Sequence, residues 1–197
     1  MEIVVASMSA GRPQQQHVEY PRIVVKVGTN VLTAGSDELN TEAMAALVEQ
    51  IVQLQRRGIE LVVVTSGAIA VGRHRVTSSQ RVGKLHPRDV QARQVFASVG
   101  QGRLMALWDE LFEQHDVVIA QALLTGNDLD DRVGYLNARN TLTRMVELGV
   151  VPIVNENDVV SIDEIAETNI GDNDNLSAQV ANLVDADLLL LLTDVAG

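Results

Sequence analysis

The stretch that decides the fold of this chain reads IVVKV at residues 23–27, TEAMAALVEQIVQLQR at 41–56 and LVVV at 61–64. The two short runs are almost continuously apolar, which is typical of strands buried on both faces of a sheet. The longer segment repeats apolar side chains every three to four positions, follows an N-capping Asn40 and stops at Gly58, so it predicts a helix over 41–56. A strand, a helix and a strand in this order predict parallel strands joined by a crossover helix.

The same alternation continues to the end of the chain. Three further apolar runs predict strands at residues 117–124, 150–154 and 188–192. Long helical patterns occupy 89–115 and 132–148, and we expect Gly100 and Gly102 to break or kink the first of them. The chain is therefore predicted to be an α/β protein, an open three-layer sandwich with a mainly parallel central sheet.

Composition indicates one domain and excludes several functions. The chain has 197 residues, 46% hydrophobic and 21% charged, so we expect a flexible leader over 1–20 and one domain over 21–197. The absence of cysteine excludes disulfides and thiolate metal sites and suits a cytoplasmic protein. No apolar run approaches the roughly 18 residues of a membrane span. With 3% aromatic residues and an acidic balance, the chain lacks the surfaces of nucleic-acid binders. We therefore expect neither membrane nor nucleic acid as a partner.

The acidic charge is concentrated in the last part of the chain. Residues 145–197 contain 11 of the 26 carboxylates and no Lys or Arg, so they account for the whole formal net charge of −11. Two carboxylates roughly 4 Å apart repel by about 4 kcal/mol at an effective dielectric constant of about 20. The motifs VNENDVV at 154–160 and GDNDN at 171–175 therefore indicate a site that a cation, an amine or another segment completes.

Polar or glycine-rich sequences follow four of the five predicted strands. They are KVGTN at 26–30, TSGA at 65–68, NEND at 155–158 and TD at 193–194. In open parallel sheets, ligands bind beyond the carboxyl ends of the strands, where loops and helix N-termini expose backbone donors. We therefore expect the functional site at this edge.

Two of these motifs suit anions, and each also has a purely structural interpretation. Lys26 with Gly28 and Thr29 would bring an ammonium group and backbone N–H groups to one phosphate, or Lys26 simply reaches solvent before a glycine turn. Ser66 would add a hydroxyl to free N–H groups at a helix start, or it is only an N-cap. The chain contains no Walker loop, and Val64 stands where a nucleophile elbow needs glycine.

The Asn and Asp side chains of the two acidic motifs suit an amino-acid ligand. Its ammonium group needs a carboxylate such as Asp158, and its carboxylate needs an amide donor such as Asn173. Alternatively, Asp174 or Asn175 only starts a helix. A calcium loop starting at Asp172 fits poorly, because Leu, Ser and Leu occupy its fifth, sixth and twelfth positions.

Together, the motifs resemble one family. VVKVGT, VTSGAIA, VPIVNEND, GDNDNLSA and LLLTDVAG are similar in order and spacing to the glutamate 5-kinases of the amino acid kinase family, over residues 21–197. ASVGQGRL at 97–104 and LNARNTL at 136–142 resemble further segments of that family. The resemblance implies transfer of the γ-phosphoryl group of ATP to the side-chain carboxylate of L-glutamate, the first step of proline biosynthesis, with Mg²⁺ bound to ATP. It also implies a cytoplasmic homo-oligomer, a dimer or tetramer, with proline as a feedback inhibitor.

The resemblance also implies a role for each motif. Lys26 neutralises charge on the transferring phosphoryl group, backbone groups of Gly28 and Thr29 assist it, and Asp174 orients Lys26 and a second lysine. The acceptor carboxylate is already ionised at neutral pH, so the reaction needs no general base. The residues implied to bind glutamate are Ser66, Gly67, Ala68, Asn155, Asp158 and Asn173, and those implied to open the nucleotide site are Thr193 and Asp194.

The family pattern extends past Gly197. The family's kinase domain continues into a nucleotide-binding half that carries the second lysine, often followed by a PUA domain. We therefore expect residues 21–197 to be the glutamate-binding portion, with a sheet that is incomplete at its C-terminal end. Two alternatives are a catalytically incomplete module that binds glutamate or proline or assembles with other subunits, and the kinase part of a pyrroline-5-carboxylate synthase.

Overall fold

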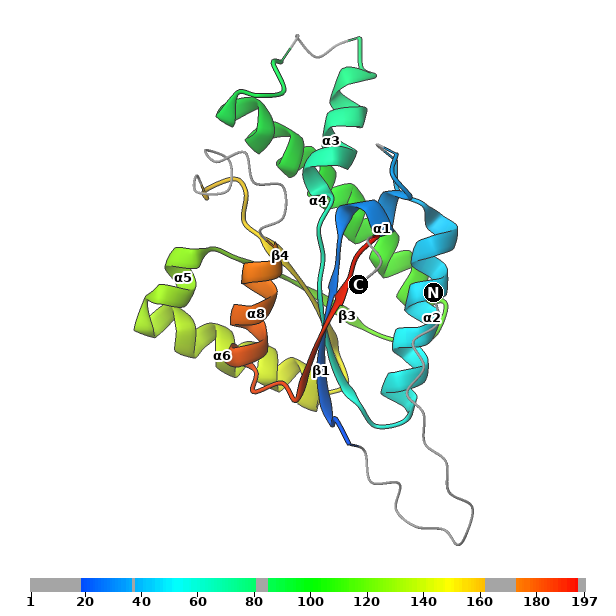
Figure 1. Ribbon diagram of the computed structural model, residues 1–197, viewed down its shortest axis with the longest axis vertical. Helices are drawn as coiled ribbons and strands as arrows, with labels where there is room; N and C mark the ends of the chain where they lie inside the picture. Colours follow the sequence, from blue (N-terminus) through cyan, green and yellow to red (C-terminus); the bar gives the residue numbers. More distant parts are fainter. Residues whose placement is uncertain (1–18, 37, 81–84, 162–172, 195–197) are drawn as a thin grey trace, which may run out of the picture.

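A computed structural model describes residues 19–36, 38–80, 85–161 and 173–194. At its centre, five parallel strands form a sheet in the order β3-β4-β2-β1-β5 (Figure 1). The strands are β1 (Arg22–Val27), β2 (Glu60–Val64), β3 (Ile119–Leu124), β4 (Val151–Glu156) and β5 (Leu188–Leu192). The predicted parallel α/β sheet is confirmed. The expected leader lies outside the described residues except for its last two positions.

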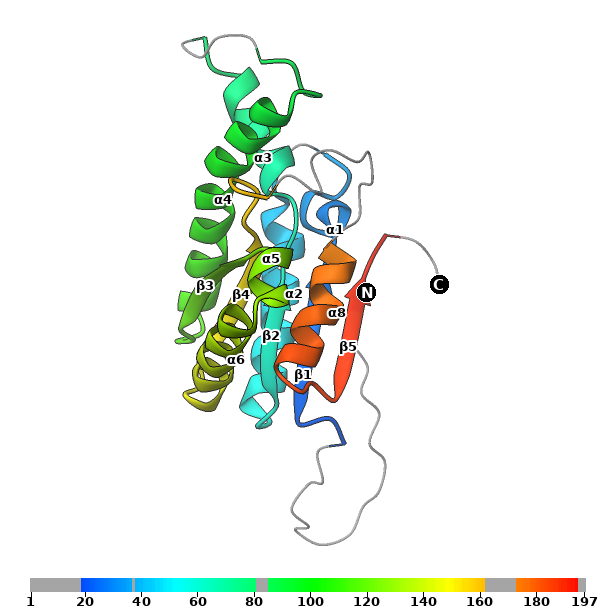
Figure 2. The ribbon, with the colours of Figure 1, turned by 90° about the vertical axis from the view of Figure 1, so that its left-hand side faces the viewer.

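Helices cover both faces of the sheet and give it three layers (Figures 1 and 2). The helices are α1 (Thr29–Thr33), α2 (Thr41–Arg56), α3 (Ala68–Thr77), α4 (Val90–Glu113), α5 (Gly126–Asp130), α6 (Arg132–Glu147) and α8 (Asn173–Leu183). Side chains of α2 and α4 share one core with Ile23 and Val25 of β1, and those of α6 and α8 share the other with Val24. This alternation along β1 is the period of a strand buried on both faces. None of the described helices combines the length and the apolar character needed to cross a bilayer.

The predicted limits of α2 are confirmed at both ends. Asn40 Oδ1 accepts a hydrogen bond from the backbone N–H of Ala43 at 2.9 Å, so it caps the helix as expected. Gly58 follows the last turn with φ of +84°, a conformation that glycine adopts without strain.

The expected break in α4 is wrong, because this helix runs unbroken through Gly100 and Gly102. Gly100 instead allows α4 to touch α3. A methyl group built at Gly100 would lie 1.8 Å from the carbonyl oxygen of Ala68, and one at Gly72 would lie 1.7 Å from that of Phe96. These glycines therefore let the two backbones meet, which fixes the start of α3 against α4. Both helices project beyond the sheet at the top of Figure 1.

Strand register aligns the carboxyl ends of the three central strands. Lys26 of β1 is the partner of Val64 in β2 and of Leu191 in β5, and Val64 lies at the same level as Val154 in β4. The residues that directly follow these positions therefore lie along one edge of the sheet, where the sequence predicts the functional site.

Candidate functional site

An ion pair between a buried lysine and a half-exposed aspartate joins the first strand to the last described helix. The side chain of Lys26 is only 7% exposed, and its Nζ pairs with a carboxylate oxygen of Asp174 in the first turn of α8. An unpaired ammonium group would be costly to bury, so Asp174 stabilises Lys26 in this position. The interpretation in which Lys26 extends into solvent is wrong.

We expect Asp174→Asn to destabilise the fold more than Lys26→Met. The first substitution leaves a buried ammonium group without its counter-charge and should lower the free energy of unfolding by about 1–3 kcal/mol. The second leaves Asp174, whose side chain is 50% exposed, to be solvated, and should cost less than about 1 kcal/mol. Urea unfolding measures both values. A larger loss for Lys26→Met would show that Asp174 does not hold Lys26 in place.

Hydrogen bonds of side-chain amides join α8, β4 and α4 to the turn after β2. Nδ2 of Asn173, the first residue of α8, donates to Ser66 Oγ (2.9 Å), to the carbonyl oxygen of Thr65 (3.0 Å) and to Asn155 Oδ1 (3.3 Å). Asn155, near the end of β4, donates in turn to Oε1 of Gln101 on α4 at 2.8 Å. The structure thus brings three of the expected glutamate-binding residues together and adds Gln101, which was not among the residues expected from the sequence. We call Ser66, Asn155, Asn173 and Gln101 the amide network.

Two buried atoms of the amide network have no hydrogen-bond partner among the described residues, and these are Asn173 Oδ1 and Gln101 Nε2. Leaving such an atom unpaired costs about 1–3 kcal/mol. Turning the Asn173 amide over would set its oxygen against the carbonyl oxygens of Thr65 and Asn155, with only the Ser66 hydroxyl able to donate to it, so the orientation with three accepted hydrogen bonds is favoured. Asn173 therefore offers a ligand an acceptor, where the sequence predicted a donor, and Gln101 offers a donor.

Asp158 adds a buried carboxylate on the turn after β4, where it is 9% exposed. The pKa of this carboxyl group is raised to about 6, mainly by burial and also by the charge of Glu156, while the charge of Arg93 opposes the rise. At neutral pH the group is mostly ionised but poorly solvated. Such a carboxylate is suited to bind a cation, for example an ammonium group.

We expect Asp158 to make the chain less stable as the pH rises from about 4 to 6. The pKa of its carboxyl is 3.8 in the absence of burial and about 6 in the folded state, so the folded chain binds more protons in this range. The contribution of Asp158 to the free energy of unfolding is fully present below a pH of 3.8. It is lost as the pH rises to about 6, by about 2–3 kcal/mol in total. Unfolding measured against pH should show this loss in the wild type and not in Asp158→Asn. Parallel profiles for the two proteins would contradict it.

Glycine turns shape the space around Lys26. A methyl group at Gly28 would lie 3.3 Å from the carbonyl oxygen of Leu192 and 3.8 Å from Lys26 Nζ, so glycine lets the turn after β1 pack closely against the end of β5. The backbone N–H of Gly28 donates to the carbonyl oxygen of Leu192 at 3.1 Å, so it is not available as the phosphate donor that the sequence predicted. Gly67, after β2, has φ of +95° and lies beside the Thr29 side chain. A residue with a side chain would be strained there.

The residues expected to open the nucleotide site lie after β5, next to the turn that follows β1. Thr193 and Asp194 directly follow this strand, and Asn30 on α1 donates to Asp194 Oδ2 at 2.9 Å. The hydrogen bond ties the segment after β5 to the Lys26 turn. Both segments therefore border the same part of the carboxyl edge.

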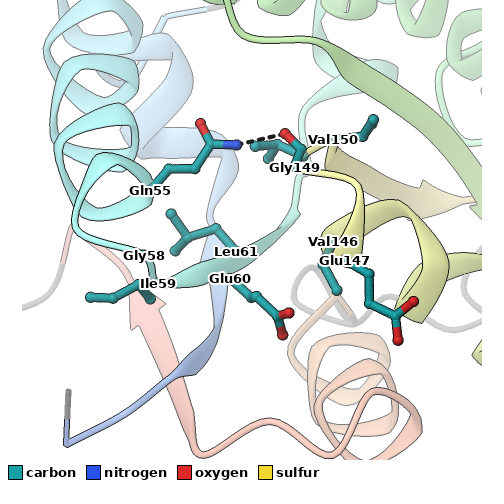
Figure 3. Close-up of a pocket in the computed structure, with 10 residues that line it drawn as sticks. Gln55, Gly58, Ile59, Glu60, Leu61, Val146, Glu147, Gly149 and Val150 are labelled. Atoms are coloured by element: carbon teal, nitrogen blue, oxygen red, sulfur yellow. Dashed lines mark hydrogen bonds between the residues drawn. The ribbon is translucent and has the colours of Figure 1, made fainter. Parts of the chain in front are cut away.

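Two hollows in the described structure lie elsewhere. A pocket of about 190 Å³ sits at the opposite edge of the sheet, between the ends of α2 and α6, where Gln55 donates to the carbonyl oxygen of Gly149 at 2.7 Å (Figure 3). A groove of about 830 Å³ runs beside α3 and α4, where His74 pairs with Glu38 at 2.9 Å. None of the expected site residues lines either hollow.

A parallel sheet whose carboxyl edge carries an ion pair with a buried lysine, small-residue turns and an amide network defines a class: open α/β proteins, in which ligands bind at this edge. Within this class, the pattern of the amino acid kinase family matches residues 21–197, and the chain belongs to that family.

Individual relatives are similar over almost the whole chain. A protein of Dehalococcoides mccartyi (strain CBDB1) is 55% identical over 179 residues, which are 90% of this chain and 46% of the relative. A protein of Herpetosiphon aurantiacus is 53% identical over 176 residues, 89% of this chain and 45% of the relative. Both are named glutamate 5-kinase. The chain thus spans about half the length of the curated relatives it matches.

Proposed function

We propose that residues 21–197 are the glutamate-binding portion of a kinase domain that transfers the γ-phosphoryl group of ATP to the side-chain carboxylate of L-glutamate. The product is L-glutamyl 5-phosphate, and the reaction is the first step of proline biosynthesis. The observation that carries the proposal is the ion pair of buried Lys26 with Asp174, beside an amide network in which one donor and one acceptor have no partner among the described residues. The names of the relatives support the same reaction.

The charges of glutamate match the groups at this edge. Its ammonium group suits the poorly solvated carboxylate of Asp158 and the free Oδ1 of Asn173. A carboxylate suits a hydroxyl such as that of Ser66. The turn residues Gly67 and Ala68 and the side chain of Asn155 would line the rest of the pocket.

Phosphoryl transfer to this substrate needs positioning and charge neutralisation more than covalent chemistry. The ammonium group of Lys26 would neutralise charge on the transferring phosphoryl group, and Asp174 would keep that ammonium group in place. The backbone N–H of Gly28 donates to the carbonyl oxygen of Leu192, so Gly28 would not itself supply a donor to the phosphate. A backbone donor for phosphate would then come from Thr29, because the N–H groups of Val31 and Leu32 donate to the carbonyl oxygen of Gly28.

ATP and Mg²⁺ would bind at the same carboxyl edge of the sheet. Thr193 and Asp194 would open the nucleotide site beside Lys26. In the described parts of the chain, no three His, Asp or Glu side chains converge as they would in a dedicated metal cage. Mg²⁺ is usually held by one or two carboxylates together with water and substrate phosphates, and Asp194 would supply such a carboxylate. Mg²⁺ bound with ATP would neutralise the negative charge of the phosphates.

The cellular context is part of the proposal. We propose a cytoplasmic homo-oligomer, a dimer or tetramer, that proline inhibits by feedback. The support is the resemblance to the glutamate 5-kinases.

The test combines calorimetric titration of L-glutamate with an assay for γ-glutamyl hydroxamate formed from glutamate, Mg-ATP and hydroxylamine. Glutamate binding supports the proposed site. Hydroxamate formation that is lost in Lys26→Met supports kinase activity in this chain itself. Glutamate binding without hydroxamate would instead favour a binding or assembly module derived from such a kinase. A chain that does neither contradicts the proposal.

A further inference from the structure

Gln101 has no role in the proposed reaction, although it lies within the amide network. Its helix is fixed there by close contact, because Gly100 touches the backbone of Ala68 at the start of α3. The position of Gln101 relative to the turn after β2 is therefore set by backbone packing.

The orientation of the Gln101 amide is set by one hydrogen bond. Its Oε1 accepts from Asn155 Nδ2 at 2.8 Å, and Asn155 Oδ1 accepts from Asn173. Reversing the Gln101 amide would place its NH₂ group against the NH₂ group of Asn155. Gln101 Nε2 is therefore the end of the network, a buried donor with no partner among the described residues.

We infer that Gln101 is a specificity-determining residue whose Nε2–H donates to a carboxylate oxygen of the bound amino acid. The inference rests on the proposed function and extends it. A buried N–H group without an acceptor is costly and rare in native proteins, so an acceptor on the ligand accounts for its position. The network then presents a donor at Gln101 and an acceptor at Asn173, which is the complement of a carboxylate and an ammonium group on one molecule.

Gln101→Glu separates this role from a structural one. The introduced carboxylate keeps an oxygen to accept from Asn155, so the network is preserved, while the N–H donor is replaced by an anionic oxygen. Gln91→Glu is the matched control, since it makes the same chemical change at an exposed position of the same helix. Gln91→Glu should bind glutamate as the wild type does.

The experiment is calorimetric titration of the 197-residue chain with three ligands. They are L-glutamate, L-glutamine, whose side-chain carboxylate is replaced by a carboxamide, and L-isoglutamine, whose α-carboxylate is replaced. We expect Gln101→Glu to weaken glutamate binding on the order of 100-fold, because a charged hydrogen bond is lost and replaced by repulsion. Binding of one of the two carboxamides should weaken far less, because its NH₂ group can donate to the new carboxylate. The carboxamide whose affinity falls least, which we call the spared carboxamide, identifies the carboxylate that Gln101 contacts.

The other possible results of the titration would overturn either the role of Gln101 or the proposed function. Equal weakening of all three ligands, or no weakening of glutamate binding, would overturn the role of Gln101 alone. Failure of the wild type to bind glutamate would overturn the proposed function and this inference with it. If Gln101→Glu does not fold, Gln101→Met removes the donor without adding charge. In that variant, the preference for glutamate over the spared carboxamide should fall about tenfold, and an unchanged preference would overturn the inference.

Discussion

Replacing Gly100 by alanine should remove at least about 4 kcal/mol of the free energy of unfolding, one of the largest losses that a single methyl group can cause. The added Cβ would lie 1.8 Å from the carbonyl oxygen and 2.7 Å from the carbonyl carbon of Ala68, and 2.7 Å from the backbone nitrogen of Gly72. Backbone atoms of a helix cannot move aside as a flexible side chain does. The helices α3 and α4 would have to separate, and the turn at Ser66 would move with them.

Gly102 provides the matched control for this prediction. It lies two residues further along α4, is exposed, and a methyl group there would meet nothing within 4 Å. Because alanine is the better helix former, Gly102→Ala should stabilise the chain by up to about 1 kcal/mol. Urea unfolding of both variants gives the comparison. Similar stabilities for the two would mean that α3 and α4 do not pack backbone to backbone.

Replacing Asp158 by asparagine should have two effects of opposite direction. At neutral pH we expect the variant to be more stable than the wild type by about 2 kcal/mol, because it no longer buries a charge whose pKa is raised to about 6. We also expect glutamate affinity to fall about 100-fold or more, because the ammonium group loses its counter-charge in a poorly solvated site. A gain in stability with a loss of binding is typical of a residue kept for function.

Chemical unfolding and calorimetry on the same Asp158→Asn preparation measure both effects. The stability measurement also shows that the variant is folded, so a loss of binding cannot be attributed to unfolding. Glutamate binding equal to that of the wild type would remove Asp158 from the site. A variant that is less stable than the wild type would show that the carboxylate is satisfied within the fold.

The sheet and its helices could be predicted because their signals are local. Continuous apolar runs mark strands buried on both faces, and the cap at Asn40 with the turn at Gly58 fixed both limits of α2. The approach of Lys26 and Asp174 could be anticipated only through the family resemblance, since 148 positions separate them in the sequence.

What the sequence could not reveal depends on tertiary contact. A glycine inside a helical pattern usually predicts a break, whereas Gly100 is explained by the backbone of α3, which the local pattern does not contain. Gln101 resembles an ordinary polar residue of a helix surface, and its one signal was its place within ASVGQGRL, a segment that resembles the family. The direction in which the Asn173 amide points depends on three oxygen atoms from other segments. The free acceptor that Asn173 presents among the described residues therefore emerged only from the structure.

The proposed function depends on one property above all, the binding of L-glutamate at the carboxyl edge of the sheet through an ionised Asp158. Calorimetric titration of the wild-type chain with L-glutamate across a range of pH tests this property. We expect one binding site per chain, with an affinity that is constant above pH 6 and falls about tenfold for each pH unit below it, as the carboxyl group takes up a proton. The absence of saturable binding at neutral pH, or an affinity that does not change through pH 6, would contradict the proposed function.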